Sequence, residues 1–308
     1  MKTVSLVLGS GGARGLAHIG VIRWLEENGF AIKSISGCSM GALVGGVYAS
    51  GKLDEFEHWI KAVTKIDIIS LLDVSWNKSG FFKGDKIINT LVDLVGNKLI
   101  EELPIRYTAV AADIKNEKEV WINSGELFDA IRASISLPML FTPYSYKDIN
   151  LIDGGVLNPV PIAPTFGDGT DMTIAVNLGG ALNCNHLIDR GQEVASSDDS
   201  EKFHEKIGSF IKNLQLKTIQ ENTLNLDAYD IVNQAFDAMQ STIARQKLAA
   251  YPPDSTIEIA RNACGTLEFD RASEVIEHGY QKASEILKSI PNDNQDSLTD
   301  CSSYVMSV

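Results

Sequence analysis

The sequence predicts an α/β fold with a mostly parallel sheet, because two strand–loop–helix units follow one another at the N-terminus. Residues 3–8 form a short apolar run of strand type, followed by a glycine cluster and a helical pattern that ends at Gly29. Residues 32–36 then predict a second strand, 37–41 a tight turn and 42–50 a second helix. Consecutive units of this kind place their strands parallel in one sheet.

Further strands are predicted over residues 106–112, 119–122, 150–152, 172–178 and 256–260, so that the sheet has about six strands. A polar loop is expected over residues 183–200. Two amphipathic helices follow it, and their apolar stripes are expected to face the core. The stripes comprise Phe203, Ile207, Phe210, Ile211 and Leu214, and then Val232, Ala235, Phe236, Met239 and Ile243.

A last helix is predicted from Val275 to Leu287, and the polar tail over residues 291–308 is expected to fray. We find no internal repeat and no long linker that would divide the chain. The simplest organisation is therefore a single domain over residues 1–290, with a helical segment at about 200–250.

Charge and cysteine content narrow the possible partners. The chain has 27 Lys and Arg against 40 Asp and Glu, and its net charge of −13 disfavours nucleic acid and anionic membranes. No apolar run reaches the roughly 20 residues that span a bilayer, so contact with a lipid surface would be peripheral and would rely on apolar side chains or on a local basic patch. The four cysteines are scattered, which predicts neither a disulfide scaffold nor a metal site and fits the reducing cytoplasm.

Ser39 is the candidate nucleophile. It lies at the centre of a G-x-S-x-G sequence between a predicted strand and a predicted helix, with Gly37 and Gly41 on either side. Such a turn holds the serine in a strained conformation and needs small neighbours. The positive end of the following helix favours the charge that develops when the hydroxyl attacks an ester carbon.

The glycine cluster after the first strand is a candidate oxyanion site. In residues 9–15 (GSGGARG), the glycines Gly9, Gly11, Gly12 and Gly15 allow backbone N–H groups to converge, and Arg14 adds a positive charge. A glycine-rich turn here could instead hold a dinucleotide pyrophosphate. Against this, position 14 lacks the last glycine of the dinucleotide fingerprint, and the second strand ends without an acidic residue.

Asp153 is the candidate base, at the end of an apolar strand and before Gly154 and Gly155. None of the five histidines follows the Ser-Asp-His order at a strand end, and His186 and His204 are expected at the surface. His186 and His204 do follow Asp153 in the chain, so a conventional triad stays open. A carboxylate can accept the serine proton directly when it lies within hydrogen-bond reach.

These motifs together resemble the patatin-like phospholipase (PNPLA) family, and most closely its bacterial cytoplasmic branch related to neuropathy target esterase. The matching blocks are GSGGARGLAHIGVI at 9–22, GCSMGALVGG at 37–46, RASISLPMLFTPY at 132–144 and DGGVLNPVP at 153–161, with a weaker match at 269–283. The sequence departs from the family at Ser10, where glycine is usual, and at Cys38, where threonine or another small residue is commoner.

The resemblance implies a three-layer α/β/α sandwich with a Ser39–Asp153 dyad, and it places Gly11, Gly12 and Arg14 on the oxyanion loop. It implies a hydrolase of acyl-lipid or small esters, of phospholipase A, lysophospholipase or carboxylesterase type, that needs no cofactor or metal. Two alternatives stay open: a lipid- or acyl-binding regulatory protein with weak catalysis, and an acyltransferase on the same fold.

Overall fold

The computed structural model describes residues 1–71, 82–182, 225–288 and 290. Its strands are β1 Thr3–Leu8, β2 Ala31–Cys38, β3 Arg106–Asp113, β4 Lys118–Ile122, β5 Tyr144–Tyr146, β6 Ile149–Asp153, β7 Met172–Gly180 and β8 Ser255–Ala260. Its α-helices are α1 Ala17–Glu27, α2 Met40–Ala49, α3 Leu53–Ala62, α4 Lys65–Leu71, α5 Asp85–Val95, α6 Leu127–Ser134, α9 Asn225–Ala250 and α10 Ala272–Leu287. The first two strand–helix units therefore lie where the sequence predicts them.

The strands form one mixed sheet in the order β5-β6-β3-β2-β1-β7-β8, and β4 pairs with β3 outside this path. The pairs β3-β2, β2-β1, β1-β7 and β7-β8 are parallel, whereas β4, β5 and β6 pair antiparallel. In the described part of the chain the sheet has eight strands, so the expectation of about six was too low. The strand that the sequence did not predict is β5, which has three residues. It forms a hairpin with β6, and the turn between them consists of Lys147 and Asp148, so it lacks the glycine that usually indicates a turn.

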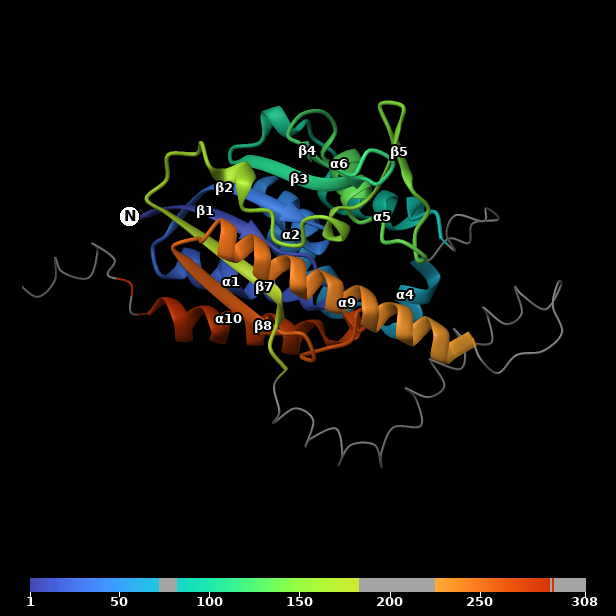
Figure 1. The fold of residues 1–308 in the computed structure, drawn as a ribbon. Coiled ribbons are helices and arrows are strands. Elements are labelled where there is room, and N and C mark those ends of the chain that lie inside the picture. The colour runs from blue at the N-terminus through green and yellow to red at the C-terminus, as the bar shows by residue number, and fades with distance from the viewer. Residues whose placement is uncertain (72–81, 183–224, 289, 291–308) are drawn as a thin grey trace, which may run out of the picture.

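Helices cover both faces of the sheet, which confirms the three-layer arrangement. The cover is unequal, with more of the described helices on one face than on the other. Side chains of even-numbered β1 residues such as Leu6 and Leu8 enter the large apolar cluster formed with α1, α2, α6 and α10. Val7 points to the opposite face, where it packs with Ala175 and with Ala244 of α9. In Figure 1, α9 crosses one side of the sheet while α1 and α2 lie on the other.

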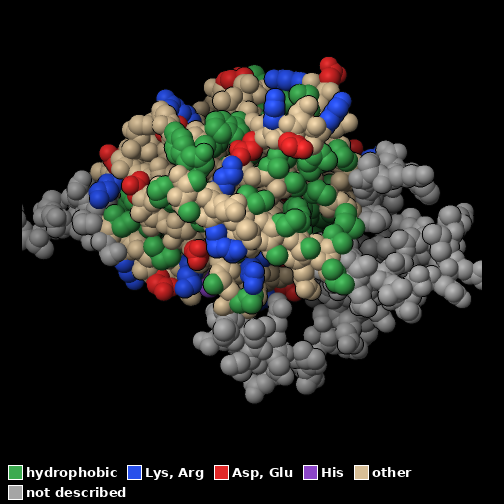
Figure 2. Space-filling view, viewed as in Figure 1, with side chains coloured by type: hydrophobic (Ala, Val, Ile, Leu, Met, Phe, Trp, Pro, Cys, Tyr) green, Lys and Arg blue, Asp and Glu red, His purple; other side chains and the backbone are tan. Residues whose placement is uncertain are grey.

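The burial of α9 differs from the sequence-based expectation. Its predicted apolar stripe does not face the core: Val232 is 45% and Met239 57% exposed, whereas Gln240 and Ser241 are buried. Figure 2, drawn in the same view as Figure 1, shows hydrophobic side chains on this face with Lys and Arg between them. The stripe expectation was wrong here because α9 packs over polar loops at strand ends, which offer hydrogen bonds to polar side chains.

Other expectations fall outside the described residues, namely the polar loop over 183–200, the amphipathic helix around 203–214 and the tail over 291–308. Among the helices that are described, none is both long and apolar enough to cross a membrane.

Candidate active site

Ser39 occupies the sharp turn between β2, which ends at Cys38, and α2, which begins at Met40. Its backbone has φ 54° and ψ −122°, a conformation that costs a non-glycine residue about 1–3 kcal/mol. Hydrogen bonds from the surrounding structure hold Ser39 in this conformation. The Ser39 N–H donates to Oγ of Ser134 at 2.9 Å, and that hydroxyl donates to the carbonyl of Val110 at 2.6 Å.

Strand β3 brings Asp153 beside Ser39. Val110 and Ala111 are neighbours on β3, and Val110 pairs with Cys38 of β2 while Ala111 pairs with Asp153 of β6. Both β2 and β6 lie on the edge of β3 opposite β4, because β4 pairs with Val110 and Ala111 as well. The end of β2 therefore meets the end of β6, and the two motifs that are far apart in the chain become adjacent.

The Asp153 carboxyl is fully buried, and burial raises its pKa to about 6. Three groups act in the opposite direction and lower the pKa: the Ser39 hydroxyl, the Gly155 N–H and the Cys38 thiol. Oδ1 accepts the Gly155 N–H at 2.8 Å and the thiol at 3.8 Å, whereas Oδ2 has no hydrogen-bond partner among the described residues. A carboxylate with a pKa near neutrality and a free oxygen can act as a general base.

The motif glycines are tightly packed. A Cβ added at any of them would lie between 2.0 and 2.7 Å from its nearest heavy atom. They are Gly9, Gly11, Gly12, Gly15, Gly37, Gly41, Gly154 and Gly155. Side chains at these positions would push apart the loops that surround Ser39 and Asp153.

The loop over residues 9–13 leaves two amides available. The N–H groups of Gly9, Ser10 and Ala13 donate to backbone carbonyls at 2.8 to 3.0 Å. Gly11 and Gly12 lie between Ser10 and Ala13, and their amide N–H groups have no hydrogen-bond acceptor in the described part of the chain. Such amides can donate to the oxyanion of a tetrahedral intermediate.

The side chain of Arg14, a residue predicted for the oxyanion site, makes its hydrogen bonds within the protein. Arg14 is 3% exposed, and all three nitrogens of its guanidinium donate hydrogen bonds within the protein. Nε donates to the Gly11 carbonyl at 3.0 Å, Nη1 to the Arg261 carbonyl at 2.7 Å and Nη2 to Oδ1 of Asp237 at 3.0 Å. Arg14 thus supports the loop through the Gly11 carbonyl.

The two departures from the family pattern both have partners near Asp153. The Ser10 hydroxyl accepts a hydrogen bond from Nε2 of Gln240 at 3.3 Å, so it points toward α9. Cys38 is a buried free thiol that faces Asp153, and both burial and the neighbouring Asp153 raise its pKa well above the usual value.

One histidine, which the sequence places inside the first helix, lies in the core. His18 is fully buried, and its Nε2 donates to the Gly9 carbonyl at 2.8 Å. Burial lowers its pKa to about 4, which keeps the ring neutral near pH 7. His58 is exposed and His278 partly exposed, while His186 and His204 lie outside the described residues.

Several residues of this region were not predicted from the sequence. Ser134 contacts the turn at Ser39, while Asp237 and Gln240 contact the glycine loop over residues 9–15. All three lie far along the chain from the segments that they contact. Ser134 lies within the matching block at 132–144, which could have drawn attention to it. The described residues contain no group of three or more His, Cys, Asp or Glu side chains with the geometry to hold a metal ion.

Comparison with known proteins agrees with the motifs. The family model described as "Patatin-like phospholipase" matches residues 6–166. An uncharacterized NTE family protein of Mycobacterium tuberculosis is 38% identical over 337 aligned positions, which cover 96% of this chain and 94% of that protein. Lysophospholipase NTE1 of Coccidioides immitis is 26% identical, over 95% of this chain and 18% of that protein.

Among solved structures, VipD from Legionella pneumophila matches with a TM-score of 0.46 and 14% identity, over 94% of this chain and 67% of that one. The family match covers the strands and loops that carry Ser39, Asp153 and the glycine loop. The chain therefore belongs to the patatin-like phospholipase family.

Proposed function

We propose that the protein is a serine hydrolase that cleaves acyl esters of lipids, with Ser39 as nucleophile and Asp153 as general base. One observation carries the proposal: a strained serine at a strand-to-helix turn lies beside a fully buried carboxylate whose pKa is near 6. The membership of the family and the similarity to a protein named a lysophospholipase support a lipid ester as the substrate.

In the first step, the Ser39 Oγ attacks the acyl carbon and Asp153 accepts the hydroxyl proton. The carbonyl oxygen becomes an oxyanion, which the free amides of Gly11 and Gly12 would receive. One backbone donor of this kind is worth about 3 kcal/mol of transition-state stabilisation. The tetrahedral intermediate then collapses, and the leaving alcohol takes the proton from Asp153.

The second step releases the acyl group. Asp153 accepts a proton from a water molecule that attacks the acyl-serine ester, a second oxyanion forms at the same loop, and the carboxylic acid leaves as Ser39 regains its proton. The same carboxylate therefore serves both half-reactions, so that a histidine is not required.

The substrate would be a phospholipid, a lysophospholipid or a smaller carboxylic ester, reached by peripheral contact from the cytoplasm. The net charge of −13 disfavours long-range attraction to an anionic lipid surface, so the approach would rely on apolar contact or on a local basic patch. Release of fatty acid from a panel of phospholipid, lysophospholipid and neutral ester substrates distinguishes these classes.

Two measurements test the proposal. A fluorophosphonate probe should modify Ser39 in the folded protein, and hydrolysis of a short nitrophenyl ester should disappear in Ser39→Ala and in Asp153→Asn. Exposed His58→Ala is the matched control and should retain the wild-type rate. A Ser39→Ala protein as active as wild type would disprove the proposal.

A further inference from the structure

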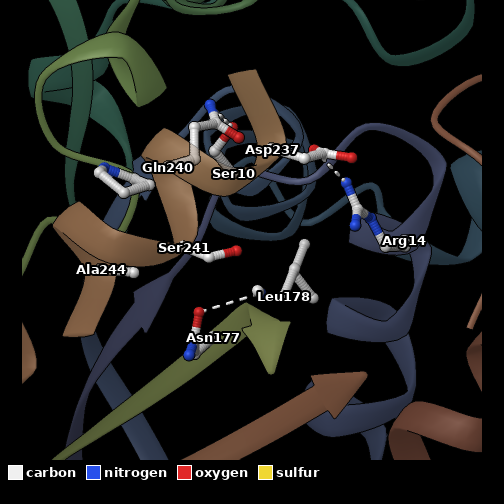
Figure 3. Close-up of a pocket in the computed structure, with 10 residues that line it drawn as sticks. Ser10, Arg14, Asn177, Leu178, Asp237, Gln240, Ser241 and Ala244 are labelled. Carbon is white, nitrogen blue, oxygen red and sulfur yellow. Dashed lines mark hydrogen bonds and ion pairs between the residues drawn. The ribbon is translucent and has the colours of Figure 1, made fainter. Parts of the chain in front are cut away.

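Helix α9 presents polar side chains to two segments of the candidate active site, the glycine loop over residues 9–15 and the turn after Asp153 (Figure 3). Asp237 and Gln240 are three residues apart and therefore share one face of the helix. In the close-up, Asp237 points toward Arg14 and Gln240 toward Ser10. These side chains and Ser241 line a cavity of about 10 Å³. This volume is the size of one water molecule, so the cavity is no substrate site.

Asp237 acts on the loop through Arg14. It is the carboxylate partner of a guanidinium that is almost completely buried, and the two side chains are 3.0 Å apart. Removal of one partner from such a pair leaves an uncompensated buried charge. Nε of the same guanidinium donates to the Gly11 carbonyl, so any movement of Arg14 is transmitted to that carbonyl.

The Gly11 carbonyl in turn sets the direction of the Gly12 amide. Both groups belong to one planar trans peptide, in which the C=O and the N–H point in opposite directions. When Arg14 binds the carbonyl on one side of the loop, the Gly12 N–H must point to the other side, where it has no acceptor within the described residues. The orientation of this donor therefore depends on the ion pair with α9.

Gln240 links the same loop to the Asp153 turn. Its Nε2 donates to Oγ of Ser10 at 3.3 Å. A Cβ on Gly155 would lie 2.3 Å from that Nε2 and 2.6 Å from that Oγ, so both polar groups are packed against Gly155. The Gly155 N–H donates to Oδ1 of Asp153 at 2.8 Å. One buried glutamine thus contacts the residues on both sides of the reaction centre.

We propose that Asp237 and Gln240 of α9 are positioning residues, which align the oxyanion amides and the Asp153 turn through Arg14, Ser10 and Gly155. This inference rests on the proposed function. It assigns a positioning role to a helix whose residues lie outside the segment matched by the family model, residues 6–166.

The test uses the full-length protein and a nitrophenyl ester, with kcat expressed per site titrated by a fluorophosphonate. Asp237→Asn keeps the shape of the side chain and removes its charge, and we expect kcat to fall about 10- to 100-fold with little change in KM. The oxyanion is absent from the bound substrate and develops in the transition state that leads to the tetrahedral intermediate, so a misplaced donor lowers the rate of that step. Asp237→Glu keeps the charge and should restore most of the rate, while kcat per titrated site leaves out any loss of folded protein.

Gln240→Ala should lower kcat in the same manner, and Gln234→Ala, at an exposed position of the same helix, is the matched control. Amide hydrogen exchange of the peptide over residues 9–16 should accelerate in Asp237→Asn and stay unchanged in Gln234→Ala. If wild type is active and both Asp237→Asn and Gln240→Ala keep kcat within twofold, the inference is wrong. If wild type neither hydrolyses the ester nor reacts with the probe, the proposed function itself is wrong.

Discussion

At the residue scale, the proposed chemistry depends on a carboxyl group whose environment opposes its charge. Asp153 is fully buried, and this burial outweighs the hydrogen bonds from Gly155 and Cys38 that favour ionisation. The resulting pKa of about 6 makes the group a stronger base than an ordinary aspartate while leaving it ionised near pH 7. The same environment has consequences for pH dependence and for stability.

We expect the activity to fall as the pH drops through about 6, because Asp153 must be ionised to accept the Ser39 proton. The Cys38 thiol lowers this pKa, so Cys38→Ala should move the acidic limb to higher pH. Cys264→Ala removes the other buried thiol of the described residues and should leave the limb in place. Profiles of kcat/KM from pH 4.5 to 8.5 provide the measurement, and a limb that Cys38→Ala does not move would contradict this assignment.

The raised pKa also predicts a gain of stability in Asp153→Asn. The carboxyl titrates near 3.8 when unfolded and near 6 when folded, so wild-type stability falls as the pH rises between these values. At pH 7.5, where both states are ionised, the difference corresponds to about 3 kcal/mol. The variant should exceed wild type by roughly 2–3 kcal/mol at pH 7.5 and by about 1 kcal/mol at pH 4.5 in urea unfolding. An equal difference at both pH values would show that the charge is not responsible.

At the element scale, the turn between β2 and α2 works only if neighbouring backbones approach closely. A Cβ on Gly41 would lie 2.0 Å from the Leu8 carbonyl oxygen and 2.9 Å from that of Gly9, which are backbone atoms of β1 and the glycine loop. Neither atom can move without displacing a strand at the centre of the sheet. The G-x-S-x-G spacing is therefore a packing requirement, whatever its part in the proposed catalysis.

We expect Gly41→Ala to lower the free energy of unfolding by about 3 kcal/mol or more, as overpacking against rigid backbone does. Gly167→Ala is the control, because an added Cβ there meets nothing within 4 Å; its effect should stay below about 0.5 kcal/mol. Urea unfolding of the two variants decides the question. Equal stabilities would mean that the elbow tolerates a side chain.

Helix α9 shows how an element can be predicted and its role mistaken. The periodicity of residues 232–243 correctly indicated a helix, and α9 extends over Asn225–Ala250. Periodicity reports which side of a helix is apolar, but not what the helix packs against. Here the partners include the Ser10 loop and the Gly155 turn, so the buried residues of α9 include the polar Gln240.

At the scale of the whole molecule, the first and the last helices of the described chain pack directly on one another. A Cβ on Gly20 of α1 would lie 1.9 Å from the Ile276 carbonyl oxygen, and one on Gly279 of α10 would lie 2.1 Å from that of Ala17. Small residues at these two positions let the helix backbones touch. Because α1 directly follows the glycine loop, α10 helps to position the start of the candidate active site.

We expect Gly279→Ala to destabilise the whole domain by about 3 kcal/mol or more, since the new methyl group meets helix backbone. Ser273→Ala, on an exposed position of the same helix, should change the stability by less than about 0.5 kcal/mol. Thermal unfolding monitored by circular dichroism measures both. A Gly279→Ala protein that melts with wild type would show that the two helices can separate without loss of the fold.

The sequence by itself determined the α/β class, most of the strands and the residues of the three motifs. These features depend on local properties: apolar runs, glycine positions, and a serine between a strand and a helix. For the same reason, the sequence could not show that β3 pairs with both β2 and β6 along one edge, which alone places Asp153 beside Ser39.

Only the tertiary structure decided how these residues are tuned. The pKa of Asp153 follows from complete burial, the role of Arg14 from its bonds to Gly11 and Asp237, and the neutral state of His18 from its enclosure in the core. Each effect depends on which groups surround a side chain in space. Residue types along the chain do not contain that information, because desolvation and long-range hydrogen bonds arise only when distant segments pack together.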